Sequence, residues 1–477
     1  MNQLSDRHYA AFRGSDGRSV AAPLCGFIPP HPVTLPPSTR IALLGLAVGI
    51  VLADSSVVTI ALPEILGRYD VEIATLAWAL TSFNLALALA ALPAAFVARR
   101  RPRPVFACGV IVFAAASLTC AFAPTFGLLV AGRALQGIAG AALVCAALDL
   151  LADATGADAP AARIWALAGI VGAAFGPAAG GILTQLLGWE SIFVVQAPLI
   201  LASLLVLVGI HAAPALEPLE RPHVAANAAL MLVSGALVAA LFLLVILLIN
   251  GWRLEPLAAG AVVTVMPLAA IVAARFASAI TPAWARAASG VILISGGLAA
   301  LGWLPHAGAA WTVPPQLAVG AGLGLALSAL TERALAGRSS QVVHGGWTLA
   351  ARHAGVVLGL LLLTPIFTAD LERNENEVLA AGTSVVLDSR IGALEKIAVA
   401  RDILVAVDEA KQEARIPDVA EVLGEPDDAD HADLVSALQD QLDRAATNAF
   451  SRSFLAAALL GVAALVPIVV GRRDVSV

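Results

Sequence analysis

Long apolar runs separated by short polar connections dominate this sequence. Because about 20 consecutive apolar residues cross the hydrocarbon core of a bilayer, runs of this length predict transmembrane helices. Twelve runs qualify, at 39–64, 75–97, 105–122, 125–151, 163–187, 191–211, 225–250, 256–274, 288–304, 312–331, 346–368 and 451–471. The composition agrees, because 59% of the 477 residues are hydrophobic and 13% are charged, whereas soluble domains carry about 25% charged residues. The chain is therefore predicted to be an all-α membrane protein with twelve transmembrane helices.

Basic residues are unevenly distributed among the short connections. Every second connection contains arginine, as in RRRPR at 99–103, whereas the connections between them offer only Arg68 and Arg253. Short loops rich in Lys and Arg face the cytoplasm. Both termini are therefore predicted to be cytoplasmic, in a multi-pass protein of the plasma membrane, which is the inner membrane of a bacterium. Residues 1–38 and 472–477 would be cytoplasmic tails, and we expect the first to be disordered.

The spans divide into two sets of six around a polar connection that contains proline. We expect an N-terminal six-helix bundle at 39–211, a central cytoplasmic linker at 212–224, and a C-terminal six-helix bundle formed by 225–368 and 451–471. The remaining segment, 369–450, would be an acidic external helical insert. Residues 370–450 contain 19 acidic and 7 basic residues.

Helical spacing of apolar residues within the insert predicts a small external cap. One predicted stripe consists of Ile391, Leu394, Ile397, Ala398 and Val405. A break at Pro417 would separate this helix from a second one at 433–449 that runs into the last span. A dedicated binding domain for a partner or substrate is the alternative interpretation of this segment.

Two ionisable residues lie deep inside predicted spans. At about 1.5 Å per residue, Asp54 lies about 21 Å from the cytoplasmic start of its helix. Arg133 lies about 18 Å above the cytoplasmic side of the hydrocarbon core. A charge in the membrane is costly and marks a functional site by default. A carboxylate that gains and loses a proton beside a cation that tunes its affinity is suited to proton coupling. A static ion pair that only fixes helix packing is the alternative.

Polar and small residues near this pair are candidates for a transport cavity and for moving contacts. Asn84, Gln136 and Gly137 are the predicted cavity-lining residues, the last two because they share a helix face with Arg133. Small residues at three- and four-residue spacing let helices approach closely. They predict a conformational seam in the fifth span, formed by Gly169, Gly172, Gly176, Pro177, Gly180 and Gly181.

Charged residues also gather near the predicted cytoplasmic ends of the tenth and eleventh spans. This group comprises Glu332, Arg333, His344, Arg352 and His353. We interpret them as interfacial charges, because long side chains at helix ends reach the headgroup region. A cytoplasmic gate formed by these residues is the alternative.

Four segments resemble motifs of the major facilitator superfamily, and within it the drug:proton antiporters usually built with fourteen spans. They are ADSSVVTIALP (53–63), WALTSFNLALA (78–88), RALQGIAGAAL (133–143) and GIVGAAFGPAAGG (169–181). The resemblance implies a proton-coupling role for Asp54 and Arg133. The loop AAFVARRRPR (94–103) is similar to the family's cytoplasmic gate loop in Arg99 and Arg103, but Ala98 stands where that loop usually has aspartate.

These observations predict a secondary active transporter that exports an amphipathic or drug-like small molecule by alternating access, coupled to protons. Expected partners are the small-molecule substrate, protons and membrane lipid, with no nucleic acid, and the protein is expected to be a monomer. The sequence contains no motif typical of an enzyme, a metal site or a cofactor site. Two alternatives stay open: an uncoupled lipid or metabolite facilitator, and a transport-dead membrane sensor or assembly protein acting through the insert.

Overall fold

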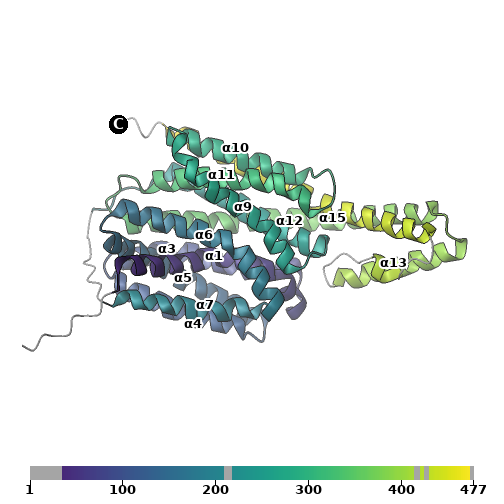
Figure 1. The fold of residues 1–477 in the computed structure, drawn as a ribbon, viewed down its shortest axis with the longest axis horizontal. Helices are drawn as coiled ribbons and strands as arrows, with labels where there is room; N and C mark the ends of the chain where they lie inside the picture. The colour runs from purple at the N-terminus through teal and green to yellow at the C-terminus, as the bar shows by residue number, and fades with distance from the viewer. Residues whose placement is uncertain (1–34, 209–217, 413–418, 424–428, 473–477) are drawn as a thin grey trace, which may run out of the picture.

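Helices form all the regular structure in the described part of the chain. The computed structural model describes residues 35–208, 218–412, 419–423 and 429–472, and these contain no strand. Twelve of the helices are long and apolar enough to cross a membrane, which confirms the predicted fold class. Figure 1 shows them side by side, with a helical extension projecting from one end. Most of the predicted N-terminal tail, residues 1–34, lies outside the described residues.

The first six spans form one bundle. They comprise α1 (Pro37–Tyr69), α3 (Trp78–Ala98) preceded by the short α2 (Ile73–Leu76), α4 (Pro102–Ala121), α5 (Phe126–Thr155), α6 (Asp158–Leu187), and α7 (Glu190–Ala202) continued by the 3₁₀ turn η1 (Ser203–Leu207). Within this bundle α1 packs on α6, and α5 packs on both α3 and α4. We call this set the first bundle.

The last six spans form the second bundle. They comprise α8 (Val224–Ile246) continued by the π-helical turn η2 (Leu247–Gly251), α9 (Pro256–Phe276) continued by η3 (Ala277–Ala279), α10 (Ala283–Gly302), α11 (Ala309–Leu335), α12 (Gln341–Asp388), and α15 (Ala429–Ala463) followed by α16 (Leu465–Val470). Across the two bundles, α6 packs on α9 and α3 packs on α12.

Local sequence explains where several helices begin and end. Pro37, Pro102 and Pro256 each occupy the first turn of a helix, where the missing N–H is not needed. Thr125 caps α5 by accepting a hydrogen bond from the Leu128 amide. Gly156 ends the same helix in the left-handed conformation, at φ 75°. These signals keep the connections between spans short.

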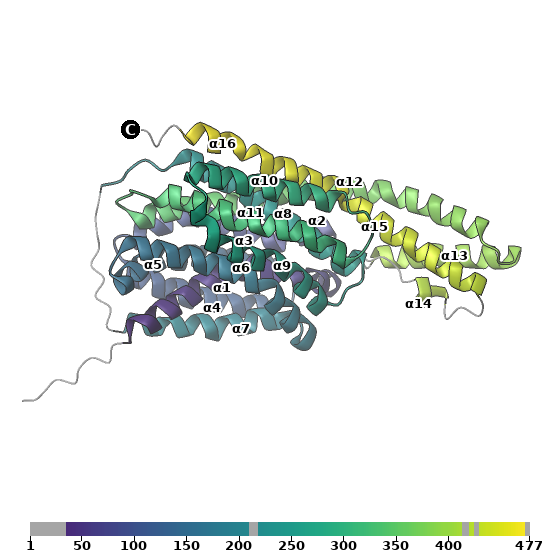
Figure 2. The same ribbon diagram turned by 45° about the horizontal axis from the view of Figure 1, so that its top comes forward.

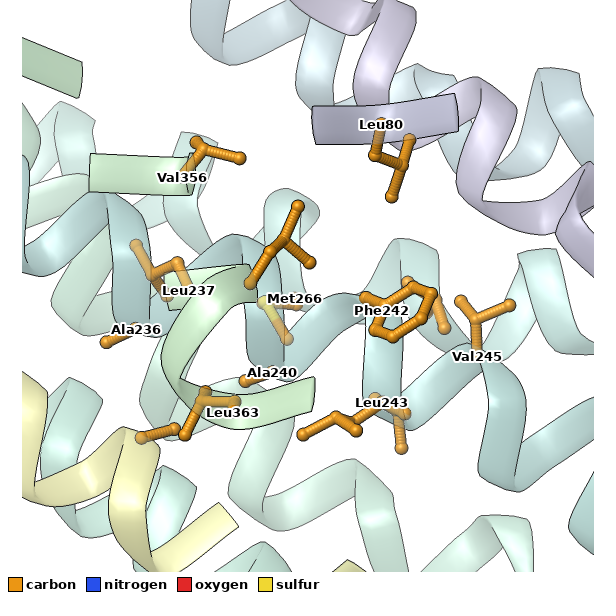
Figure 3. Packing of buried hydrophobic residues seen from close by; sticks show 14 of the residues in the cluster. Leu80, Ala236, Leu237, Ala240, Phe242, Leu243, Val245, Met266, Val356 and Leu363 are labelled. Atoms are coloured by element: carbon orange, nitrogen blue, oxygen red, sulfur yellow. The ribbon is translucent and has the colours of Figure 1, made fainter. Parts of the chain in front are cut away.

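The two ends of the molecule differ. α1 begins and α16 ends at the same end, which we call the termini end (Figures 1 and 2). The extension projects from the opposite end, which we call the insert end. One apolar core contains residues of both bundles: it extends along the second bundle and into the insert-end half of the first, where Leu80 of α3 lies opposite Leu237 and Phe242 of α8 (Figure 3). A second core fills the termini-end half of the first bundle and includes Val342 and Leu349 of α12.

The insert is a helical lobe with its own small core. It consists of the ends of α12 and α15, together with α13 (Ala393–Gln412) and α14 (Val419–Leu423). Val386, Ile391, Val419, Leu434, Leu438 and Leu442 are buried in this core. The lobe is joined to the bundle by the buried carboxylate of Asp370, whose Oδ1 lies 3.2 Å from Arg452 Nη1.

The predicted apolar stripe of the insert is wrong apart from Ile391. Leu394, Ile397, Ala398 and Val405 are exposed on α13. Val399, Ala400 and Ile403 pack against the small core instead. The reason is that α13 carries apolar residues on two faces, so that helical spacing alone does not select the buried one. The predicted break at Pro417 lies outside the described residues.

Candidate functional site

Asp54 of α1 and Arg133 of α5 meet inside the first bundle. Arg133 Nη1 lies 2.5 Å from Asp54 Oδ2, and neither side chain is exposed to solvent. Gln196 of α7 donates a hydrogen bond to Asp54 Oδ1 at 3.0 Å. A buried ion pair is stable only with good geometry and further hydrogen bonds, because both ions are removed from water. The amide of Gln196 supplies one of these bonds.

Arg133 is held by neutral acceptors as well as by Asp54. Its Nε donates to the Ala79 carbonyl at 3.0 Å, and its Nη1 donates to Gln136 Oε1 at 2.9 Å. The guanidinium carbon lies 4.4 Å from the centroid of the Phe83 ring, a cation–π geometry. The position of Arg133 therefore does not depend on the carboxylate alone.

Sequence reasoning missed Gln196. It is a lone amide side chain in an apolar span. Its Oε1 also accepts a hydrogen bond from Gln136 Nε2 at 3.4 Å. Gln136 Nε2 in turn donates to Ser117 Oγ at 2.8 Å. The rule that singled out Asn84, that polar groups inside a span need a stated partner, would have found Gln196 too.

A cavity lies between the two bundles. Its volume is about 130 Å³, several times the ~10–15 Å³ that one water molecule requires. The polar residues that line it are Ser55, Ser56, Asn84, Ser234, Arg352 and His353. The rest of the lining is mainly apolar and comes from both bundles. Such a site, largely apolar with a few convergent polar groups, is typical of small-molecule binding.

Two of the three predicted cavity-lining residues lie elsewhere. Asn84 lines the cavity, but Gln136 is fully buried in the hydrogen-bond network of Arg133. Gly137 packs against the backbone of Phe83 in α3. The face of α5 that carries these residues points into the first bundle, away from its interface with the second bundle. Asp54 is also absent from the cavity wall, although its neighbours Ser55 and Ser56 form part of it.

A hydrogen bond across the cavity joins the two bundles. His353 Nδ1 of α12 lies 2.7 Å from Asn84 Oδ1 of α3. The Asn84 amide nitrogen donates to Ser55 Oγ at 3.1 Å and to the Leu80 carbonyl at 2.8 Å. With Nδ2 acting as donor, Asn84 Oδ1 is the acceptor and His353 Nδ1 carries the proton.

The interpretation of Arg352 and His353 as interfacial charges is wrong. α12 begins at Gln341, so that Arg352 lies about 17 Å along the helix, at mid-membrane depth. Both residues line the cavity. Glu332 and Arg333 do lie at the end of a span, where Arg286 Nη2 is 2.5 Å from Glu332 Oε2 and Arg333 Nη2 donates to the Gly471 carbonyl. His344 is buried, and neither ring nitrogen forms a hydrogen bond within the described residues.

The small-residue face of α6 contacts two different helices. Gly169, Gly172, Gly176 and Gly180 pack against α1 of the same bundle, and Gly172 lies directly on the backbone of Gly49. Gly181 packs against Pro256 of α9, and the Pro177 carbonyl lies against Gly260 of α9. The contacts of Gly181 and Pro177 with α9 cross between the bundles. The predicted seam is therefore divided between a contact inside the first bundle and one between the bundles.

The predicted gate loop lies at the termini end. Arg103 Nη2 donates to the Leu207 carbonyl at 2.9 Å, a bond inside the first bundle. Arg99 borders a surface hollow beside Leu219 of the segment that leads into the second bundle. Nearby, Arg338 Nη1 of the second bundle lies 3.5 Å from Glu220 Oε2. The role of Arg99 and Arg103 as a gate stays a prediction.

Comparison with known proteins decides the family. The sequence profile of the Major Facilitator Superfamily matches residues 44–374, most of the chain. The chain belongs to this superfamily of transporters. Its solved relatives agree in fold: a bacterial homologue of the human lysosomal transporter Spinster, in an inward-facing and occupied conformation, superposes with a TM-score of 0.62 at 18% identity, over 91% of this chain and 97% of that one.

Curated proteins named for drug efflux and antibiotic resistance match between a third and two fifths of this transporter. The drug efflux pump JefA of Mycobacterium tuberculosis is 31% identical over 191 residues, which are 39% of this chain and 38% of that protein. The methylenomycin A resistance protein of Bacillus subtilis is 32% identical over 34% of this chain and 36% of its own. The tetracenomycin C resistance and export protein of Streptomyces glaucescens is 36% identical over 34% and 31%. Each match spans only about a third of the relative's length.

Proposed function

We propose that this superfamily member exports an amphipathic small molecule in exchange for protons, by alternating access. The relatives named for drug efflux and for antibiotic resistance support export. The termini end would face the cytoplasm of a bacterial inner membrane, because the arginine-rich connections lie at that end. The cavity between the bundles would hold the substrate.

One observation carries the coupling: a fully buried carboxylate–guanidinium pair lies directly behind the cavity wall. Asp54 pairs with Arg133, and the next residues in α1, Ser55 and Ser56, line the cavity. A small rotation of α1 relative to α5 would expose the carboxyl group to cavity water. A proton could then reach a group that is shielded in the present conformation.

Protonation would change the balance between two conformations. With Asp54 ionised, its charge and that of Arg133 neutralise each other, and the first bundle is held together at this point. With Asp54 protonated, the ion pair is lost, while Arg133 keeps its bonds to Gln136 and to the Ala79 carbonyl. The ligand and the proton then act on one equilibrium by favouring different states, which is the thermodynamic basis of exchange.

Contacts between the bundles lie toward both ends of the molecule in this conformation. At the insert end, apolar packing around Leu80 and the contact of Gly260 with Pro177 join the bundles. At the termini end, Gly346 of α12 packs against Ala95 of α3. Contacts between small residues separate without leaving large unfilled volumes, because no long side chains interlock. Alternating access requires each set to open in turn.

The test is gradient-driven uptake into proteoliposomes. Tetracenomycin C, puromycin and a dansyl-aminohexanoate would be offered to the parent protein and to Asp54→Asn, with and without a pH gradient. We expect at least one compound to accumulate with the parent only under the gradient, and the variant to lose that dependence. Asp440→Asn, on the exposed surface of α15, is the matched control. Equal, gradient-independent uptake by the parent and by Asp54→Asn would refute coupling.

An uncoupled facilitator is the second candidate, favoured by one specific observation. Asp54 and Arg133 are fully buried and lie outside the cavity lining, as expected of a static pair that fixes helix packing. In this case a gradient would change neither the rate nor the extent of uptake, and Asp54→Asn would act only through stability. The uptake experiment separates the two functions directly.

A further inference from the structure

Arg352 presents a guanidinium to the central cavity. It extends from α12 of the second bundle, and a Cβ at Gly169 of α6 in the first bundle would lie 3.9 Å from its Nη1. Within the described residues it forms no ion pair, hydrogen bond or cation–π contact. The charge therefore lies between the bundles, at the place where a transported molecule would bind.

Arg133, which is also buried in the membrane, differs from Arg352 in the groups that surround its charge. Arg133 has a carboxylate, two hydrogen-bond acceptors and an aromatic face around it. Arg352 has apolar neighbours and the imidazole of His353 on the same helix. A cation inside a membrane protein is stabilised by an anion or by water in a cavity. An anionic group on a molecule that enters the cavity would supply such a partner.

The remaining lining indicates the shape of that partner. Most cavity residues are aliphatic, among them Leu237, Val263 and Met266. Ser234 of α8 lines the same cavity. Asn84 and His353 are occupied with each other. Arg352 and Ser234 thus offer donors to an anionic group, while the aliphatic wall accommodates an apolar body.

We propose that the cavity recognises an amphipathic organic anion, whose carboxylate or phosphate binds the guanidinium of Arg352. This inference rests on the proposed transport function and names the substrate class of the same cavity. A guanidinium suits both groups, because its planar array of N–H donors matches their oxygen atoms. Recognition of the anion involves Arg352, whereas proton exchange involves Asp54, so that the two can be tested separately.

Equilibrium binding to the purified full-length protein in detergent tests this proposal without any flux. The probes are dansyl-aminohexanoate and its uncharged primary amide, followed by dansyl fluorescence at one pH. The parent is expected to bind the acid at least ten-fold more tightly than the amide. Arg352→Gln should lose this preference and leave amide binding unchanged, while Arg352→Lys should keep part of it. Arg444→Gln, an exposed arginine on α15, is the control and should behave as the parent does.

Three outcomes would overturn the proposal. The first is equal binding of the acid and the amide by the parent. Arg352→Gln could weaken both probes by the same factor, which would indicate a general effect on the cavity. Finally, chloride alone could displace the acid at concentrations that saturate the site, which would indicate an inorganic anion site. If Arg352→Gln does not fold, the unfolding temperature of the parent is measured with each probe. A rise with the acid and not with the amide supports the proposal, and an equal rise with both overturns it.

Two competitors then distinguish the sources of the anion. Octanoate represents a soluble carboxylate, and lysophosphatidic acid in mixed micelles represents a bilayer lipid headgroup. Displacement of the probe by either one supports the proposal, and the stronger competitor identifies the source. Displacement by neither overturns it. Because these measurements use no gradient, binding that depends on Arg352 would stand even if the Asp54→Asn uptake experiment refuted proton exchange.

Discussion

At the residue scale, the stability of the transmembrane region depends on how each buried charge is compensated. Asp54 and Arg133 compensate each other, with Gln196 and Gln136 completing the network. Breaking a buried pair by removing one partner is more harmful than removing both, because a single charge is then left without compensation. The pair therefore contributes to stability as well as to the proposed coupling.

A double-mutant cycle measures that contribution. Arg133→Gln should destabilise the protein by about 3–5 kcal/mol, because Asp54 loses its counter-ion in a dry site. Asp54→Asn combined with Arg133→Gln should recover much of this loss, since no charge remains. Thermal unfolding in detergent reports both effects. Additive single effects, with no recovery in the double variant, would show that the two side chains do not interact.

The depth of these residues could be predicted from the sequence, but not the direction in which they face. Counting residues along the helices placed Asp54 and Arg133 at similar heights, and they do meet. The prediction that Gln136 and Gly137 line the cavity is wrong, because the sequence identifies a polar face on α5 but not the helices that this face meets. The interpretation of Arg352 as an interfacial charge is wrong because the predicted span begins at 346, whereas α12 begins at Gln341.

At the element scale, close helix contacts depend on glycine. A Cβ at Gly172 would collide with the backbone of Gly49, which has no flexible part that could move aside. Gly45, on the same helix as Gly49, has nothing within 4 Å of its Cβ position. Gly172 and Gly45 thus form a matched pair for comparison. Gly172 is required for packing, whereas Gly45 has space for a side chain.

Substitution of these two glycines by alanine should have opposite effects. Gly172→Ala should destabilise the protein by about 1–3 kcal/mol, because α1 and α6 must separate. Gly45→Ala should be neutral or stabilising by up to about 1 kcal/mol, because alanine is the better helix former. Thermal unfolding of both variants is the measurement. Equal effects of the two substitutions would contradict the close contact between α1 and α6.

The insert is an element that buries its own core. Val386, Leu434 and Leu438 pack within the lobe and not against the bundles. Deleting 375–445 should therefore leave the twelve spans folded and uptake by the proteoliposomes within about two-fold of the parent. Loss of all uptake, with a normal unfolding temperature, would instead favour a role for the insert in transport.

At the scale of the whole molecule, the number and the order of spans followed from hydropathy alone. Twelve apolar runs became twelve helices, because unpaired backbone groups are not tolerated in hydrocarbon and only helices satisfy them locally. The way in which the bundles meet did not follow, since it depends on which face of each helix is shared. The insert was predicted as helical, but α13 offers two apolar faces and the wrong one was chosen.

The two proposals together predict the effect of membrane potential. If one proton enters for each monovalent anion that leaves, each cycle moves two charges in the same electrical direction. Each charge is worth about 2.3 kcal/mol per 100 mV. An imposed potential should therefore drive transport of the dansyl acid more strongly than that of its amide. Valinomycin-clamped proteoliposomes provide the measurement, and an equal response of the two probes would exclude this stoichiometry.

The most direct test of proton exchange follows protons and substrate together. Proteoliposomes containing a trapped pH dye would receive the transported compound at uniform starting pH. For the parent, we expect protons to move opposite to the compound, and for Asp54→Asn we expect no proton movement. Substrate flux by the parent without any proton movement, or unchanged proton movement with Asp54→Asn, would contradict the role assigned to Asp54.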